Sequence, residues 1–195
     1  SALWVVRPPK LSVLKVLQTW KPDYSGGFNP AALAARPDGR EVWFHTRRPE
    51  QIQVLDPARD VVTATIPVGY AVSDIVFSTD SRRAYATDGN AVHVLDVSSR
   101  SETGSVGIGA GPVEAALTCD GQRLFTANIN SADVSVVDAQ SLAFLGNIQA
   151  GPRPVAIAAQ PFVPASRDIV PPAAVTNLRA TAASTSSMTL AWTAP

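Results

Sequence analysis

An internal repeat of about forty residues constrains this sequence more than any other feature. Three turn signals, at residues 37–39, 79–81 and 119–121, are separated by 42 and then 40 residues. Each contains an Asp followed by Gly or Ser, as in the Pro-Asp-Gly at 37–39. A constant period of this length indicates a protein built from stacked copies of one small structural unit.

Two further sets of landmarks keep the same register. Asp56, Asp96 and Asp138 each end a short apolar run and are separated by 40 and 42 residues. Thirteen residues after each Asp comes a glycine: Gly69, Gly109 and Gly151. Because the spacing changes only by two residues in a loop, we interpret the chain as three complete copies of one unit.

The apolar residues between these landmarks alternate with polar ones. Ile52 and Val54 show the period of two, and so do their counterparts at 92 and 94 and at 134 and 136. This is the pattern of strands that bury one face. Four short strands in forty residues predict an all-β fold, namely a β-propeller of four-stranded blades, and exclude a solenoid of helix pairs.

These motifs resemble the YVTN family of β-propeller repeats over residues 1–160. The aromatic tetrapeptide of that family corresponds to residues 43–46, 85–88 and 125–128. Its proline after the glycine is present as Pro112 and Pro154. The second unit departs from the pattern, with Val72 at that position. The resemblance implies a propeller from a bacterial or archaeal secreted or surface-layer protein, but it does not define a function, because these propellers have several roles.

Incomplete units flank the three complete ones. Residues 4–7 match the aromatic tetrapeptide, and residues 154–158 match a first strand. The two partial units are complementary and would together make one blade, which would remove exposed strand edges. Either the chain closes a four-bladed ring, or it belongs to a larger ring, commonly seven-bladed in this family. We favour the larger ring because the sequence begins in the middle of a unit.

The last part of the sequence has a different composition. Residues 161–171 are rich in Pro and Ala, which predicts an extended linker. Residues 172–195 resemble the first two strands of a fibronectin type III domain, with Trp192 at the position of its buried tryptophan. A complete sandwich needs about 100 residues, so only its opening is present.

Composition narrows the classes of function. Sixteen basic and sixteen acidic residues balance, without the cationic excess that nucleic-acid binding requires. No run of eighteen apolar residues predicts a membrane span. A single cysteine, Cys119, excludes an internal disulfide framework and a cysteine-cluster metal site. We expect no cofactor and no metal.

No catalytic residue is predicted from the motifs. The repeated acids Asp38, Asp80 and Asp120 lie in turn sequences, where Asp accepts backbone N–H groups. Cys119 has no basic neighbour in sequence and is expected to be a small buried side chain. His93 alternates with apolar valines and is expected to face solvent. The glycine-rich residues 104–111 resemble a dinucleotide loop, but no helix follows them.

A rim of arginine and aromatic side chains is the candidate binding surface. Its predicted members come from two repeats: Trp43, His45, Arg47, Arg48, Arg82 and Arg83. The simpler interpretation is that the arginines are solvated charges in turns.

We expect a non-enzymatic binding or assembly module of an exported or cell-surface protein, outside the cytoplasm, with loops that present a protein or glycan interaction surface. One alternative is the propeller portion of a periplasmic enzyme, an oxidoreductase or lyase, with its catalytic residues outside this chain. A second alternative is a structural subunit of a filament or envelope assembly.

Overall fold

The computed structural model describes residues 32–47 and 49–159 in full. It also places the backbone of four strands outside this range: β1 (Ala2–Arg7), β2 (Ser12–Gln18), β15 (Thr176–Ala183) and β16 (Met188–Thr193). The calls on the linker at 161–171 and on Arg48 lie outside the described residues. β1 pairs antiparallel with β2, and β15 pairs antiparallel with β16.

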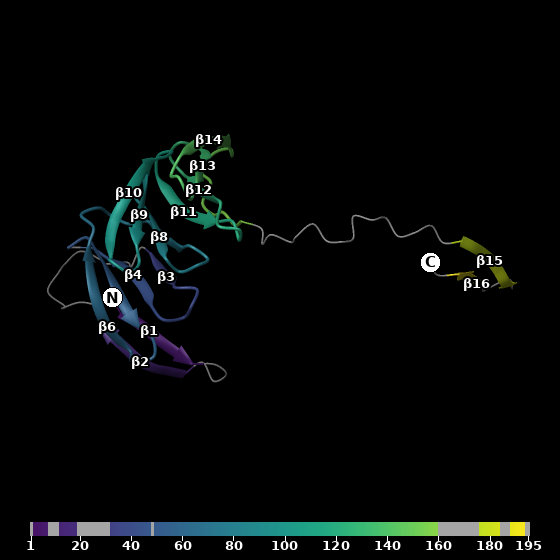
Figure 1. Ribbon diagram of the computed structural model, residues 1–195, viewed down its shortest axis with the longest axis horizontal. Helices are drawn as coiled ribbons and strands as arrows, with labels where there is room; N and C mark the ends of the chain where they lie inside the picture. Colours follow the sequence, from purple (N-terminus) through teal and green to yellow (C-terminus); the bar gives the residue numbers. More distant parts are fainter. Residues whose placement is uncertain are drawn as a thin grey trace. The chain divides into compact units, whose positions relative to one another are not determined.

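Twelve strands form three four-stranded antiparallel sheets (Figure 1). The first sheet consists of β3 (Leu33–Ala35), β4 (Val42–Thr46), β5 (Gln51–Asp56) and β6 (Val61–Pro67). The second consists of β7 (Asp74–Phe77), β8 (Arg83–Thr87), β9 (Ala91–Asp96) and β10 (Ser101–Gly107). The third consists of β11 (Pro112–Leu117), β12 (Arg123–Asn128), β13 (Asp133–Asp138) and β14 (Phe144–Gln149).

Within each sheet, strands that follow one another in sequence are hydrogen-bonded neighbours. The all-β class is therefore confirmed, and the part of the chain that the structure describes contains no helix able to span a membrane. The chain divides into two compact units, Ser1–Pro161 and Phe162–Pro195. The resemblance of the second unit to fibronectin type III stays a prediction.

The turn between the first two strands of each sheet follows the predicted chemistry. The Oδ1 atoms of Asp38, Asp80 and Asp120 each accept the backbone N–H two residues later, at 3.0–3.1 Å. The residue directly after each Asp has a positive φ: Gly39, Ser81 and Gly121. The structural role predicted for these acids is confirmed, because the carboxylates are used to close turns.

The turn between the last two strands also repeats. Asp56, Asp96 and Asp138 each accept the backbone N–H three residues later, at distances of 2.7–3.1 Å. The residue after that is left-handed although it is not glycine: Asp60, Arg100 and Leu142, with φ between 54° and 59°. Such a conformation costs about 1–2 kcal/mol in an L-residue, so all three sheets have a strained residue at the same position of this turn.

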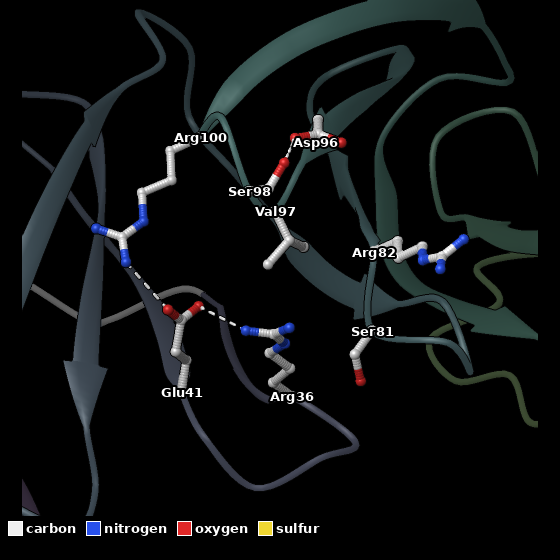
Figure 2. Close-up of a pocket in the computed structure, with 8 residues that line it drawn as sticks. All are labelled: Arg36, Glu41, Ser81, Arg82, Asp96, Val97, Ser98 and Arg100. Atoms are coloured by element: carbon white, nitrogen blue, oxygen red, sulfur yellow. Dashed lines mark hydrogen bonds and ion pairs between the residues drawn. The ribbon is translucent and has the colours of Figure 1, made fainter.

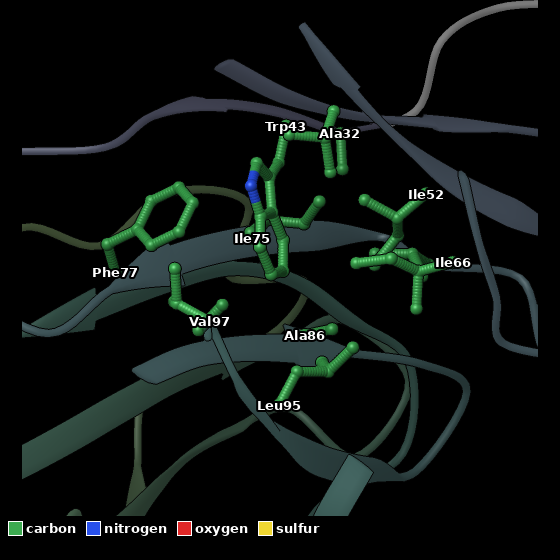
Figure 3. Close-up of a cluster of buried hydrophobic side chains, with 12 residues drawn as sticks. Ala32, Trp43, Ile52, Ile66, Ile75, Phe77, Ala86, Leu95 and Val97 are labelled. Atoms are coloured by element: carbon green, nitrogen blue, oxygen red, sulfur yellow. The ribbon is translucent and has the colours of Figure 1, made fainter. Parts of the chain in front are cut away.

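The sheets pack face against face in the order of the sequence. One apolar cluster joins the first and second sheets, with Trp43, Ile52 and Ile66 against Ile75 and Phe77 (Figure 3). A second cluster joins the second and third sheets through side chains from both: Tyr85, Val92, Val94, Ala115, Leu124 and Val137. Alternation along β8 and β9 explains this arrangement, because neighbouring residues point to opposite faces. The second sheet is therefore covered on both sides.

First strands lie next to one another across the sheets, with β7 in contact with both β3 and β11. A carboxylate links β7 to β11, because Oδ2 of Asp74 accepts the backbone N–H of Ala115 at 2.8 Å. Glu114, at the equivalent position forty residues later, accepts the N–H of Ile157 through Oε2 at 3.0 Å. The link is thus repeated beyond the third sheet.

Candidate functional site

The predicted arginine and aromatic residues do not form one rim, because the exposed arginines lie at opposite ends of the sheets. β4 and β8 occupy equivalent places and run in the same direction. Arg47 follows the end of β4, whereas Arg82 precedes the start of β8 beside Arg36 and Glu41. The sequence could not show this, because it does not say which ends of neighbouring strands meet. Arg47 and Arg82 are both exposed.

Trp43 lies in the core rather than on a rim. Its side chain is fully buried, and its ring meets that of Phe77 edge-on, with centroids 5.2 Å apart. The indole Nε1 donates a hydrogen bond of 2.9 Å to Oε2 of Glu41. Burial of this kind satisfies the one polar atom of the ring while its apolar body fills the space between two sheets. Trp43 therefore has no exposed surface for a partner.

His45 is also fully buried, at the end of β4. Its Nε2 lies 2.7 Å from Oε2 of Glu50. Burial lowers the pKa of His45, and this effect outweighs the attraction of Glu50, which acts in the opposite direction. Its Nδ1 is buried and has no hydrogen-bond partner within the described part of the chain. His45 is therefore best described as a neutral buried histidine at neutral pH.

Arg83 connects two sheets. Its Nη1 donates to the backbone carbonyls of Ala139 and Gln140 in the third sheet, at 3.3 and 3.2 Å. The hydroxyl of the neighbouring Tyr85 donates to the same Ala139 carbonyl at 2.9 Å. Arg83 is half-buried, and its guanidinium is occupied by these contacts. Of the predicted members, this leaves Arg82 as the exposed cation at this end of the sheets.

A pocket of about 530 Å³ lies at the turn end of the first and second sheets (Figure 2). It is lined by residues from three turns and the adjoining strand ends: Arg36, Glu41, Ser81, Arg82, Asp96, Val97, Ser98 and Arg100. Sequence reasoning found only Arg82 in this set. The others lie in turns of two repeats, and only the packing of the sheets brings those turns together.

Glu41 is the centre of the charges in the pocket. Arg100 Nη2 from the second sheet lies 3.0 Å from its Oε1, and Arg36 Nη1 lies 3.7 Å from its Oε2 (Figure 2). Arg36 also contacts Asp38 through Nη2 at 3.2 Å. Its Nε is buried and has no hydrogen-bond partner among the described residues. The ion pair of Glu41 with Arg100 therefore joins the first and second sheets.

The opposite wall of the pocket is occupied by Asp96. Hydrogen bonds from the hydroxyl of Ser98, and then from the backbone and hydroxyl of Ser99, lower the pKa of Asp96 to about 2. Arg82 forms no ion pair within residues 32–47 and 49–159. The lining contains three guanidinium groups and two carboxylates, so it has a formal charge of +1. Such a lining can bind an anion through Arg82, which is exposed.

His93 does not face solvent as the alternation predicted. Its ring stacks on Tyr70, with centroids 3.8 Å apart, and its Nδ1 lies 2.9 Å from Oε1 of Glu102. Tyr70 comes from the loop after β6, so the neighbouring sheet covers this position. Burial, and to a smaller extent the charge of Glu102, raises the pKa of Tyr70.

Cys119 is exposed, so the expectation that it would be a small buried side chain was wrong.

The glycine-rich segment has a packing role. Gly109 donates its N–H to Oγ of Ser135 at 2.9 Å. A Cβ there would lie 2.4 Å from Nδ2 of Asn128 and 2.5 Å from Oδ1 of Asp133. The glycine therefore allows a loop to approach a buried polar network of the third sheet. No group of three or more His, Cys, Asp or Glu side chains could hold a metal ion within the described ranges.

Comparisons with known proteins support the class of fold. No protein-family model matches the sequence, and no curated protein matches it. Among solved structures, a chain of hydrazine synthase from Kuenenia stuttgartiensis is similar, with a TM-score of 0.62 and 18% sequence identity. The match covers 71% of this chain and 40% of that one. At this identity the likeness is one of fold alone, and this chain spans about two fifths of its neighbour's length.

Proposed function

We propose that the three sheets are consecutive blades of a β-propeller, and that the chain is a non-enzymatic binding or assembly module of an exported or cell-surface protein. The order of packing supports the propeller: each sheet covers the next, and the first strands adjoin across the sheets. Equivalent side chains also point the same way in successive sheets, as Trp43 and Tyr85 do.

The pairing of the two strands in the C-terminal unit is compatible with a modular surface protein. β15 and β16 pair antiparallel, in the order expected for the first two strands of a sandwich domain. The sequence of this unit resembles fibronectin type III. We propose that it acts as a spacer, a role that suits a protein outside the cytoplasm.

The pocket around Glu41 is the observation that carries the binding role. It has the size of a small-ligand site, its lining has a net positive charge, and the exposed Arg82 is available as a donor. We therefore propose that the turn end of the first two sheets binds a carboxylate group of a protein or glycan partner. Two carboxylates in the same lining favour a ligand with a single negative group over a highly charged one.

Binding of two acidic probes tests this proposal. The full chain would be titrated with methyl galacturonoside, a sugar with one carboxylate, and with a capped peptide whose only charged residue is one Glu, with the methyl ester of the sugar as the uncharged control. Arg82→Gln should weaken binding of the acidic probe about tenfold, because it removes a charge-assisted hydrogen bond. Arg47→Gln, at the opposite end of the sheets, is the matched control and should leave Kd unchanged. Equal losses in both variants, or no binding of either acidic probe, would contradict the proposal.

The similar solved structure is named as an enzyme, so the alternative of a periplasmic enzyme has to be compared with the binding role. The likeness extends to the fold only, at 18% identity. In the described residues the titratable side chains with direct contacts, such as Glu41 and Asp96, hold turns and sheets together. The binding role is therefore the function that these contacts support best.

A further inference from the structure

The aspartate at the last turn of each sheet uses its two carboxylate oxygens for different contacts. Oδ1 of Asp56, Asp96 and Asp138 closes the turn in all three sheets. Oδ2 of Asp138 lies 2.6 Å from Nη1 of Arg123, and Oδ2 of Asp56 lies 3.8 Å from Nε of Arg59. Asp96 forms no ion pair within the described part of the chain. Of the three equivalent carboxylates, the one in the pocket is therefore the one without an arginine.

The arginine that could neutralise Asp96 is engaged elsewhere. Arg83 is the direct cross-strand partner of Asp96. Arg123 has the same position opposite Asp138 and binds it. Nη1 of Arg83 instead donates to two backbone carbonyls of the third sheet, at 3.2 and 3.3 Å. Because hydrogen bonds, the first from the hydroxyl of Ser98, hold the pKa of Asp96 at about 2, this carboxylate is charged at neutral pH.

Arg82 stands next to this carboxylate in the fold. Asp96 ends β9 and Arg82 precedes β8, and both line the side of the pocket that belongs to the second sheet (Figure 2). Their backbones adjoin, because Val97 donates its N–H to the carbonyl of Arg82 at 2.9 Å. Since Arg82 lies opposite Val97 and not opposite Asp96, the alternation of the strands does not direct the two charged side chains at each other. The pocket therefore offers one positive and one negative group that are unpaired among the described residues.

The other charges of the pocket are already paired. Glu41 binds Arg100 at 3.0 Å and Arg36 at 3.7 Å, and Arg36 also contacts Asp38 at 3.2 Å. These two arginines and two carboxylates have a combined formal charge of zero. A ligand that complements the remaining groups therefore carries a negative and a positive charge rather than a negative charge alone.

We infer that the partner bound at this pocket is a protein segment with an acidic side chain and a lysine close together, with the carboxylate on Arg82 and the ammonium group on Oδ2 of Asp96. Protein segments carry both groups, whereas a uronic sugar has a carboxylate and hydroxyls but no positive charge. A sugar hydroxyl could donate to Asp96 but would leave its charge without a counter-ion, and a pair of charged groups makes the stronger hydrogen bond. The inference rests on the proposed function and narrows its partner from protein or glycan to protein.

Titration of the full chain with capped peptides that contain one Glu and one Lys tests the inference. Two versions are used, with Glu and Lys adjacent or separated by one Gly, and the reference peptide has Gln in place of Lys. The better version should bind about fivefold more tightly than the reference, the gain expected from one ion pair at a partly exposed site. Asp96→Asn keeps an oxygen to accept the turn hydrogen bonds and removes the charge, so it should abolish this gain. Asp56→Asn, at the equivalent turn of the first sheet, is the matched control and should preserve it.

The outcomes separate the inference from the proposed function. If neither the peptides nor methyl galacturonoside binds, both fall. If the reference peptide binds as tightly as both Glu–Lys peptides, the pocket binds carboxylates and only the inference is overturned. Equal gains from Lys in the original chain and in Asp96→Asn, or tighter binding of methyl galacturonoside than of both Glu–Lys peptides, would also overturn it. The peptide comparison on the unchanged chain does not depend on how well the variant folds, and the unfolding midpoint of Asp96→Asn is measured in parallel.

Discussion

The second and third sheets have the same strand order and the same turns, yet among the described residues only the second is covered on both faces. Tyr85 in the second sheet is fully buried, while Phe125, its equivalent forty residues later, is half-buried. The repeat sets the type of residue at a position, and the neighbouring sheet sets how deeply it is buried. Stability effects at equivalent positions should therefore differ between the two sheets.

Truncation of these two aromatic side chains should give the largest difference. Tyr85→Ala removes a buried ring and its hydrogen bond to Ala139, so it should destabilise the chain by about 3–5 kcal/mol. Phe125→Ala should cost less than about 2 kcal/mol, because its ring is only partly removed from water. Urea unfolding of both variants measures the comparison. Equal losses would mean that the face of the third sheet that carries Phe125 is already covered in the isolated chain.

Substitution of Gly109 tests how closely the loop between the second and third sheets packs on the third sheet. Gly109→Ala forces a Cβ against Asn128 and Asp133 and should destabilise the chain by about 1–3 kcal/mol. Gly107→Ala is the matched control, since a Cβ there meets nothing within 4 Å. Thermal unfolding would show the difference. If both variants unfold at the same temperature, the loop before β11 does not pack as closely as described.

The two carboxylate links should differ in strength. Asp74→Ala leaves the N–H groups of Ile75 and Ala115 without their acceptor and should cost about 2 kcal/mol. Glu114→Ala frees only the N–H of Ile157 and should cost less, about 1 kcal/mol. Urea unfolding of the two variants, and hydrogen exchange at Ala115 and Ile157, would measure the effects. A larger loss for Glu114 would reverse the comparison.

Asp74 should also contribute to pH dependence. Burial raises its pKa, so the folded state holds this proton more tightly than the unfolded one. Its contribution to stability is therefore greatest at acidic pH and is lost as the pH rises through the raised pKa. Asp74→Asn should remove this part of the pH profile of urea unfolding. A profile unchanged by Asp74→Asn would count against burial of the charged group.

The smallest expected effect concerns His45 in the first sheet. Because burial lowers its pKa, the unfolded state binds the proton more readily, and stability should decline as the pH falls below about 6.5. His45→Gln should reduce this decline. Thr87→Ala, at the equivalent position of the second sheet, should leave it unchanged. The same slope in all three proteins would show that His45 does not titrate differently on folding.

Local chemistry made much of the fold predictable from the sequence. Asp80 and Asp120 close their turns through contacts two residues away, so the residues that specify each turn stand together in the sequence. The prediction that His93 faces solvent was wrong, because Tyr70 from the loop after β6 stacks on its ring. Alternation alone cannot say what lies opposite a strand face.

The candidate site was harder to predict for the same reason. Trp43 and His45 were expected on a binding rim, and the structure buries both. The pocket depends on the contact of Glu41 with Arg100, which lies 59 residues away. One signal was available in the sequence: acidic residues at 74 and 114 occupy the same repeat position, and each accepts a backbone N–H from the chain about forty residues later.

The left-handed residues at Asp60, Arg100 and Leu142 have a consequence for how this repeat can change. Glycine would relax each turn, yet Arg100 reaches Glu41 of the preceding sheet and Leu142 packs on the cluster shared with the preceding sheet. A side chain at this position therefore strains the backbone but makes a contact with the preceding sheet that glycine could not make. Glycine at this position would relax the turn but remove the contact with the preceding sheet, so these turns cannot be relaxed without loosening the packing of one sheet on the next.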